Sequence, residues 1–149
     1  MSVDVITEVT IACPHELVAN YAANPDNASS WYVNIKSAEW KSPPPLRIGS
    51  KVAFVAFFLG KRMAYTYEIT EYVPHQRLVM RTSEGPFPME TTYTWETSAQ
   101  NGTRMTLRNR GNPSGFSGLL APFVAMAMRR ANQGDLTRLK ALLEKQQAA

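Results

Sequence analysis

The stretch that decides the fold is residues 118–146, GLLAPFVAMAMRRANQGDLTRLKALLEKQ. Apolar and small side chains recur in it every three to four residues, which is the period of an α-helix. The spacing predicts one long terminal helix of about 28 residues, with a length on the order of 40 Å. Its predicted buried stripe consists of Ala121, Ala125, Met128, Asn132, Leu136, Leu139 and Leu143.

Ahead of that helix the sequence is dominated by strand patterns. Residues 3–11 alternate apolar and polar side chains, which is typical of a half-buried strand. Pro14 ends this strand and suits the first position of a short helix over 14–22, and a second short helix or turn follows over 25–30. Further strands are predicted over 35–40, 51–58, 61–72, 77–83, 89–97 and 103–110.

Short turn signals separate these strands, so we expect antiparallel hairpins. Asn101-Gly102 is the most specific signal, because a type I′ turn needs positive φ at both central residues. Seven antiparallel strands curl, and the long helix must cross the concave face to bury its stripe. The sequence therefore predicts a single α+β domain over residues 1–149. In it a curved seven-stranded sheet wraps around the C-terminal helix and leaves a cavity between them.

Composition bounds the class of protein. The chain has 149 residues, 44 % of them hydrophobic and 19 % charged, which is typical of one globular domain. It has neither the pattern of a signal peptide nor an apolar run long enough to span a membrane. Its one cysteine, Cys13, cannot form an internal disulfide. These features predict a soluble, cytoplasmic protein that is not integral to a membrane.

Positive charge is concentrated near the C-terminus. The formal net charge is +4, and residues 101–149 hold eight basic and two acidic side chains. Arg104, Arg108 and Arg110 alternate along a predicted strand, which favours a solvated sheet face over a nucleic-acid footprint. We therefore predict no nucleic-acid partner.

The sequence offers little support for metal or nucleophile chemistry. His15 and His75 are the only histidines, and neither shares a metal-ligand spacing with Cys13. Cys13 and His15 flank a predicted strand-to-helix junction and should point apart, which predicts an inert thiol. Glu71 has the strand parity of Tyr67 and is a candidate acid or base at a strand end. No metal, cofactor or assigned catalytic residue is predicted.

Six motifs follow one another along the chain: ACPHELV at 12–18, Asn24-Pro25 followed by Trp31, IGSKV at 48–52, ITEYVPHQRL at 69–78, Gly102-Thr103, and DLTRLKALLE at 135–144. In this order they resemble the START and pollen-allergen helix-grip superfamily (SRPBCC), especially its bacterial polyketide cyclase/dehydrase-like branch. The resemblance covers nearly the whole chain and implies a pocket for a lipid-like or aromatic molecule. It places Trp31 and Tyr32 near the pocket entrance; the alternative is that they anchor the core beneath the loop. Because a fold does not by itself imply a function, the family name is not evidence that this protein has cyclase activity.

One face of the predicted sheet is rich in aromatic and methionine side chains, which suit an irregular apolar guest. Core packing is the alternative explanation for each of them. The amides of Asn109 and Asn132 are the groups that a dry core would least readily accept. An apolar pocket with a few polar groups is the usual form of a small-molecule site. The predicted ligand-binding residues are Trp31, Phe54, Tyr65, Tyr67, Met80, Met89, Tyr93, Trp95, Met105, Asn109, Met128 and Asn132.

Three functions remain open from the sequence. The first is binding of a hydrophobic small molecule, such as a lipid, a polyketide or an aromatic metabolite, between sheet and helix. The second is an enzyme of the polyketide cyclase/dehydrase type, which would orient a poly-ketone for aldol closure through Tyr65, Tyr67, Asn109 and Asn132. The third is a protein-interaction or regulatory module that uses the basic C-terminal region and an apolar patch. That patch lies opposite the buried stripe and consists of Leu119, Phe123 and Met126. It is a candidate homodimer surface; the alternatives are that it docks on a membrane surface or is covered by the loop over 111–118.

Overall fold

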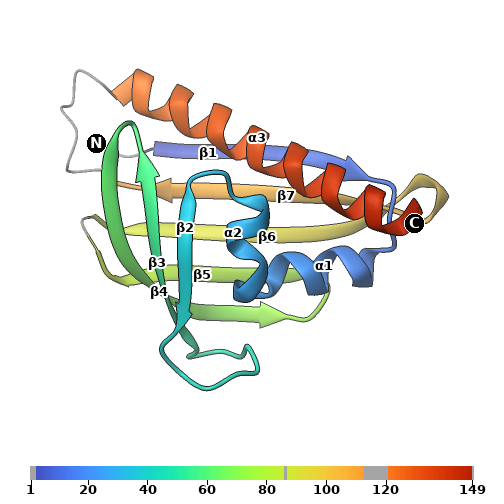
Figure 1. Ribbon diagram of the computed structural model, residues 1–149, viewed down its shortest axis with the longest axis horizontal. Helices are drawn as coiled ribbons and strands as arrows, with labels where there is room; N and C mark the ends of the chain where they lie inside the picture. The colour runs from blue at the N-terminus through green and yellow to red at the C-terminus, as the bar shows by residue number, and fades with distance from the viewer. Residues whose placement is uncertain (1–2, 86, 113–120, 149) are drawn as a thin grey trace.

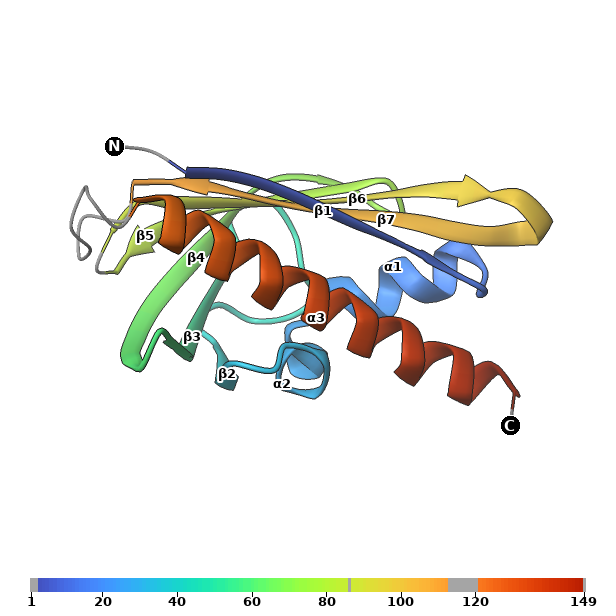
Figure 2. The same ribbon diagram turned by 90° about the horizontal axis from the view of Figure 1, so that it is seen from above.

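A computed structural model describes residues 3–85, 87–112 and 121–148. Seven strands form one antiparallel sheet in the order β1-β7-β6-β5-β4-β3-β2, and helix α3 crosses its concave face (Figures 1 and 2). The elements are β1 Val3–Ile11, α1 His15–Ala23, η1 Pro25–Asn27, α2 Ala28–Trp31, β2 Ile35–Trp40, β3 Lys51–Phe58, β4 Lys61–Val73, β5 Arg77–Glu84, β6 Met89–Ser98, η2 Ala99–Asn101, β7 Gly102–Gly111 and α3 Ala121–Ala148.

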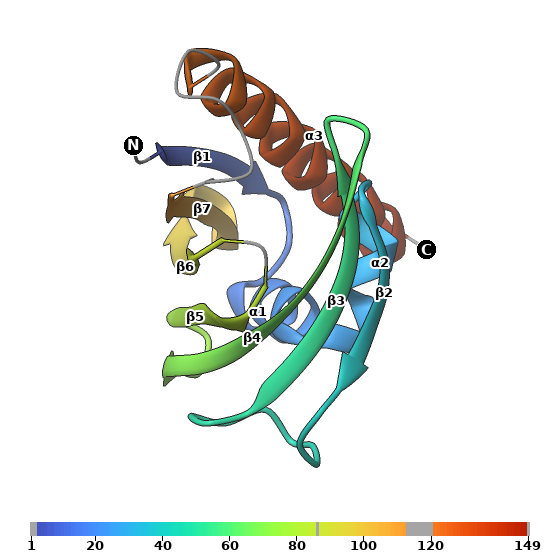
Figure 3. The same cartoon turned by 90° about the vertical axis from the view of Figure 1, so that its left-hand side faces the viewer.

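The sheet curves strongly around the helix, as the end-on view shows (Figure 3). Its longest strand, β4, pairs with β5 through two register irregularities, one at Thr66/Tyr67 and one at Ile69/Glu71. Such irregularities bend a strand and increase its twist. The predicted α+β helix-grip architecture is confirmed, and each predicted strand agrees with an observed one to within two residues at either end.

Helix α3 is held to the sheet along the predicted stripe from Met128 to Leu143. Nearer its start the prediction was less accurate, because the buried residue is Val124, which was not predicted, and Ala125 is only half-buried. Leu136, Leu139 and Leu143 are fully buried in the main core, together with residues from α1 and α2. Nearer the start of α3, Val124 and Met128 pack in a second, smaller cluster with two valines of β1. The first residues of the predicted helix, 118–120, lie outside the described residues.

The predicted turn at Asn101-Gly102 is wrong by one residue. The backbone has positive φ at Gln100 and Asn101, within η2, whereas Gly102 is extended with a φ of −88° and begins β7. Glycine is needed at 102 for space. A Cβ atom there would lie 3.0 Å from the carbonyl oxygen of Ile11 and 2.8 Å from Oγ of Ser98.

The basic side chains of β7 point away from the helix and pair with acids on neighbouring strands. This arrangement agrees with the predicted solvated face. The pairs are Arg104 with Glu96, Arg108 with Asp4, and Arg110 with Glu90. Among the described residues, no helix has the length and apolar character needed to cross a membrane.

Candidate functional site

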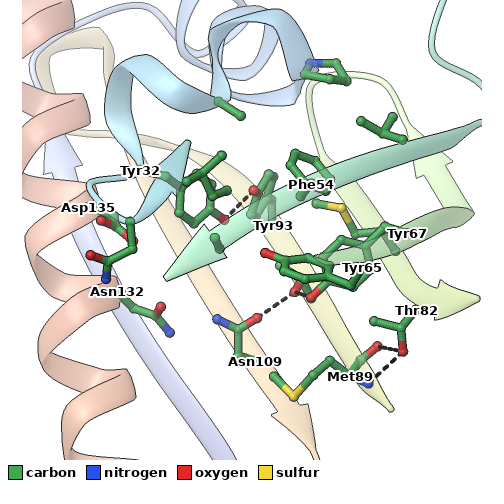
Figure 4. Close-up of a pocket in the computed structure, with 18 of the residues that line it drawn as sticks. Tyr32, Phe54, Tyr65, Tyr67, Thr82, Met89, Tyr93, Asn109, Asn132 and Asp135 are labelled. Carbon is green, nitrogen blue, oxygen red and sulfur yellow. Dashed lines mark hydrogen bonds between the residues drawn. The ribbon is translucent and has the colours of Figure 1, made fainter. Parts of the chain in front are cut away.

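A cavity lies between the concave face of the sheet, α3 and the segment around α2 (Figure 4). The centres of water molecules could occupy about 150 Å³ of it. One water needs only about 10–15 Å³ of such space, so the cavity has room for a small organic molecule. Its wall is mostly aliphatic, aromatic and thioether surface. The polar side chains in the wall are those of Asn24, Tyr32, Asn34, Tyr65, Tyr67, Thr82, Thr91, Tyr93, Asn109, Asn132 and Asp135.

Aromatic rings from β3 and β4 form a cluster in this wall. The rings of Tyr65 and Tyr67 meet edge to face with their centroids 5.2 Å apart, and Phe54 lies 5.8 Å from Tyr65 and 5.9 Å from Tyr67. They come together because alternate residues of β4 share a face and Phe54 pairs with Tyr65 across the two strands. The cluster offers flat, polarizable surface to an apolar guest.

A chain of hydrogen bonds orders the polar groups of the sheet. The hydroxyl of Thr91 donates to Oδ1 of Asn109 over 2.6 Å. Because Thr91 has only one hydroxyl hydrogen, the hydroxyl of Tyr67, 2.7 Å away, must donate to Thr91. Tyr67 and Asn109, at the two ends of this chain, are labelled in Figure 4. Nearer the α2 end, the hydroxyls of Tyr32 and Tyr93 share a second hydrogen bond.

The four cavity tyrosines are uncharged near neutral pH. Burial raises the pKa of Tyr67 to about 12. Burial likewise raises the pKa of Tyr32, Tyr65 and Tyr93 well above the usual value. These phenols can therefore donate hydrogen bonds, but they are poor bases.

Helix α3 brings an amide and a carboxyl group to the same wall. Asn132 is 5 % exposed, and its Nδ2 atom is buried without a hydrogen-bond partner among the described residues. One turn later, Asp135 is 3 % exposed, and its Oδ1 atom accepts a 2.9 Å hydrogen bond from the backbone N–H of Val33. Burial raises the pKa of Asp135 to about 6, while the Val33 N–H and the charge of Arg138 partly oppose that shift.

Nine of the twelve residues predicted from the sequence line this cavity. Their role in ligand binding stays a prediction. They are Phe54, Tyr65, Tyr67, Met80, Met89, Tyr93, Asn109, Met128 and Asn132.

The other three predicted residues, Trp31, Trp95 and Met105, do not line the cavity. All three are buried in the core, with exposed fractions of at most 2 %. Trp95 and Met105 face each other across β6 and β7 at the end of the sheet that α1 covers. Trp31 and Trp95 pack against Tyr93, which does line the cavity. The concave face is thus longer than the cavity, and α1 fills its far end.

Asp135, Thr91 and Tyr32 line the cavity and were not among the predicted ligand-binding residues. A signal existed for Asp135, because it lies three residues after Asn132 and so falls on the same helix face. Thr91 lies between Met89 and Tyr93 in the strand alternation. The signal for Tyr32 was its position beside Trp31 near the expected pocket entrance.

The remaining candidates from the sequence lie away from the cavity. Glu71 follows a register irregularity of β4, is exposed, and forms a 3.0 Å ion pair with Arg77. Cys13 is buried, and burial raises the pKa of its thiol, which lowers its reactivity near neutral pH. These positions give neither residue a part in the cavity.

A curved antiparallel sheet closed by a long helix around an apolar cavity defines a helix-grip protein. The chain belongs to the family described as "Polyketide cyclase / dehydrase and lipid transport", whose sequence model matches residues 2–144. It is thus a member of the START/SRPBCC superfamily. No functionally curated protein matches the chain in sequence.

Solved structures with low sequence identity share the fold. The ZhuI aromatase/cyclase from Streptomyces sp. R1128 is 16 % identical with a TM-score of 0.81, over 97 % of this chain and 95 % of that one. A START superfamily protein from Mycobacterium smegmatis is 12 % identical with a TM-score of 0.82, over 95 % and 97 %. The protein TTHA0849 from Thermus thermophilus is 23 % identical with a TM-score of 0.80, over 93 % and 94 %.

Proposed function

We propose that the protein binds a hydrophobic small molecule in the cavity between sheet and α3. The observation that carries the proposal is the wall itself, in which aromatic, aliphatic and methionine side chains surround a few polar groups. Core packing alone would have filled this space, because protein interiors leave few voids larger than a water molecule. An apolar cavity with convergent polar groups is the usual form of a small-molecule site.

The expected affinity follows from the apolar surface that a ligand would bury. A bicyclic aromatic molecule that buries about 300 Å² gains roughly 7 kcal/mol from its removal from water. The loss of translational and rotational freedom offsets part of this gain. We therefore expect dissociation constants between about 10 μM and 1 mM for simple aromatic probes.

The test compares two alanines of the same helix. Ala131 lines the cavity, and Ala141 is exposed further along α3. Binding of the neutral fluorescent probe N-phenyl-1-naphthylamine is measured for the wild type, Ala131→Phe and Ala141→Phe. We expect Ala131→Phe to weaken binding at least tenfold and Ala141→Phe to leave it unchanged, with circular dichroism confirming that both fold. Absence of probe binding to the wild type, or equal binding by all three proteins, would contradict the proposal.

Catalysis in the same cavity is a second candidate, and Asp135 is the observation that favours it. A carboxyl group with a pKa of about 6 can exchange protons near neutral pH. The Asp135 carboxylate would take a proton from the carbon between two ketones, and that carbon would then form a new C–C bond to a second carbonyl carbon. A neutral tyrosine hydroxyl would donate a hydrogen bond to the oxygen of the attacked carbonyl, and this oxygen would receive the proton back from Asp135. The ZhuI structure named above is that of an aromatase/cyclase and shares the fold.

Mass spectrometry of a synthetic linear poly-ketone incubated with the protein tests this candidate. We expect Asp135→Asn to lower the rate of cyclised product at least tenfold while probe binding is retained. Equal rates for wild type, variant and buffer alone would leave ligand binding as the function.

A further inference from the structure

We propose that the cavity selects ligands whose polar end is a hydrogen-bond donor without negative charge, a hydroxyl or an ammonium group, and that this end lies against Asp135 and Asn132. Ligands with the same apolar part but a carboxylate or another anionic group at the polar end bind more weakly. The inference rests on the proposed binding function and names the ligand chemistry of that site.

Where the structure describes it, the wall of the cavity offers an anion no cationic side chain. No lysine, arginine or histidine lies among the lining residues in the described ranges, and the wall's one acidic side chain is Asp135. The stretch 113–120, PSGFSGLL, holds no ionisable side chain in its sequence. An anion in this cavity would lose its hydration without gaining a cationic partner. It would also be repelled by a like charge in a medium of low dielectric constant.

Helix α3 presents to the cavity two hydrogen-bonding groups without partners in the described ranges. Among the described residues, Oδ1 of Asp135 accepts a hydrogen bond from the backbone N–H of Val33, and Oδ2 of Asp135 has no hydrogen-bond partner. The amide nitrogen of Asn132 is buried and has no hydrogen-bond partner in the part of the chain that the structure describes. Figure 4 shows both residues on the α3 side of the cavity, across from Tyr65 and Tyr67.

A hydroxyl group satisfies both needs at once. It donates its hydrogen to the carboxyl oxygen of Asp135 and accepts one from the amide of Asn132, which lies one turn away on the same helix face. An ammonium group donates to Asp135 and adds charge complementarity. A carboxylate can accept from Asn132 but has nothing to donate to Asp135, so the unpartnered oxygen remains unpaired.

The position of Asp135 is fixed, so the discrimination does not depend on a mobile side chain. Its backbone lies in the middle of α3, and its Oδ1 atom is held by the N–H of Val33 at 2.9 Å. Arg138, the cation that acts on it, donates instead to the carbonyl oxygen of Ser30 over 2.7 Å. Asp135 has no ion pair with any of the described residues.

Three probes with one aromatic body test the inference: naphthalene-2-methanol, 2-naphthylmethylamine and 2-naphthoate. Their dissociation constants are measured at pH 7.5 by displacement of N-phenyl-1-naphthylamine. We expect the alcohol and the amine each to bind at least tenfold more tightly than the naphthoate. A naphthoate that binds within threefold of the alcohol overturns the inference. This comparison uses the wild type and so does not depend on a variant that folds.

A charge-removing variant then tests the assignment to Asp135. In Asp135→Asn the amide oxygen can still accept from Val33, so the fold should be retained. In this variant we expect the dissociation constants of the alcohol and the naphthoate to differ by less than threefold. Glu16→Gln, which removes an exposed carboxyl group on α1, should keep the full difference. A tenfold gap that persists in Asp135→Asn overturns the assignment.

The two proposals fail in different ways. If the neutral fluorescent probe binds but the alcohol and the amine bind no more tightly than the naphthoate, the inference fails and the binding function stands. If neither the fluorescent probe nor any naphthalene derivative binds, the binding function fails and the inference fails with it.

Discussion

Asn132 occupies a position where selection for stability alone would favour an apolar side chain. It lies between Met128 and Leu136 on the buried stripe of α3, and its Nδ2 atom has no partner among the described residues. An unpaired buried amide costs roughly 1–3 kcal/mol. A residue kept at that cost is better explained by a ligand than by the scaffold.

The first prediction replaces this amide with an isosteric apolar side chain. Asn132→Leu should leave the melting temperature unchanged or raise it, because the unpaired donor is removed. The same variant should weaken binding of naphthalene-2-methanol at least tenfold, or about 1.4 kcal/mol. Differential scanning fluorimetry and probe displacement measure the two properties, and Gln146→Leu, at an exposed position of α3, is the control. Lost stability with intact binding would remove Asn132 from the site.

The second prediction concerns the pH dependence of stability through Asp135. Its pKa is raised from an ordinary value of 3.8 to about 6, so the folded state binds more protons than the unfolded state between these values. The group therefore destabilises the fold increasingly as pH rises from about 4 to above 6. Asp135→Asn should be more stable than the wild type, and its advantage should be larger at pH 7.5 than at pH 5 by about 1 kcal/mol.

Urea unfolding at the two pH values measures this difference. Glu16→Gln, which removes an exposed carboxyl group on α1, is measured in parallel as the control. A difference between Asp135→Asn and wild type that is independent of pH would show that the carboxyl does not titrate in this range.

The site could be predicted from the sequence only where strand or helix period determines it. Asn132 was found because it lies on the stripe, and Tyr65 and Tyr67 because they share a strand face. Trp95 and Met105 lie on the same face of the sheet. The alternation of a strand predicts which face a side chain is on, but not whether its place along the strand is next to the cavity. Their distance from the cavity depends on where α1 packs.

At the level of elements, the strands and helices were largely predictable and the fine geometry of one turn was not. Asn-Gly is the usual type I′ pair, which placed the turn at Asn101-Gly102. In the structure, the close approach of β1 to the start of β7 requires glycine at 102, and the positive φ angles fall on the two residues before it. Steric contact between distant strands decided this position, and a local pattern cannot report it.

The third prediction compares two glycines that serve different needs. Gly134 lies within α3, and a Cβ atom there would contact nothing within 4 Å. Gly134→Ala should raise the free energy of unfolding by about 1 kcal/mol through helix propensity. Gly102→Ala should lower it by about 1–3 kcal/mol, because the new atom would press on the Ile11 carbonyl oxygen. Urea unfolding of both variants checks the signs, and equal effects would contradict the steric role of Gly102.

At the scale of the whole molecule, the cavity exists because the helix is anchored at two separated places. Leu136, Leu139 and Leu143 anchor its C-terminal half in the main core, and Val124 and Met128 anchor its N-terminal half on β1. Between these two anchors the sheet curves away from the helix, and α3 contributes the polar residues Asn132 and Asp135 to the cavity wall. Removing an anchor would therefore be expected to collapse or open the cavity, whereas the Ala131→Phe variant fills it.

The last prediction concerns association between molecules. Phe123 and Met126 are 66 % and 58 % exposed on α3, and Leu119, the third residue of the predicted patch, lies outside the described residues. Adjacent exposed apolar side chains on one helix face are typical of interaction surfaces. We predict that the protein forms a homodimer through this patch. A Phe123→Ser, Met126→Ser double variant should then sediment as a monomer where the wild type sediments as a dimer.

Sedimentation velocity at micromolar concentrations gives the result, and Ile6→Ser is the matched control because Ile6 is 53 % exposed on β1. Since the two substituted side chains contribute little to the monomer's own core, the melting temperature of an isolated monomer should not change. Any difference in melting temperature between the wild type and the double variant should therefore become smaller on dilution, because the wild-type dimer then dissociates into monomers as well. A wild type that sediments as a monomer at every concentration would contradict the dimer and leave the patch free for another partner.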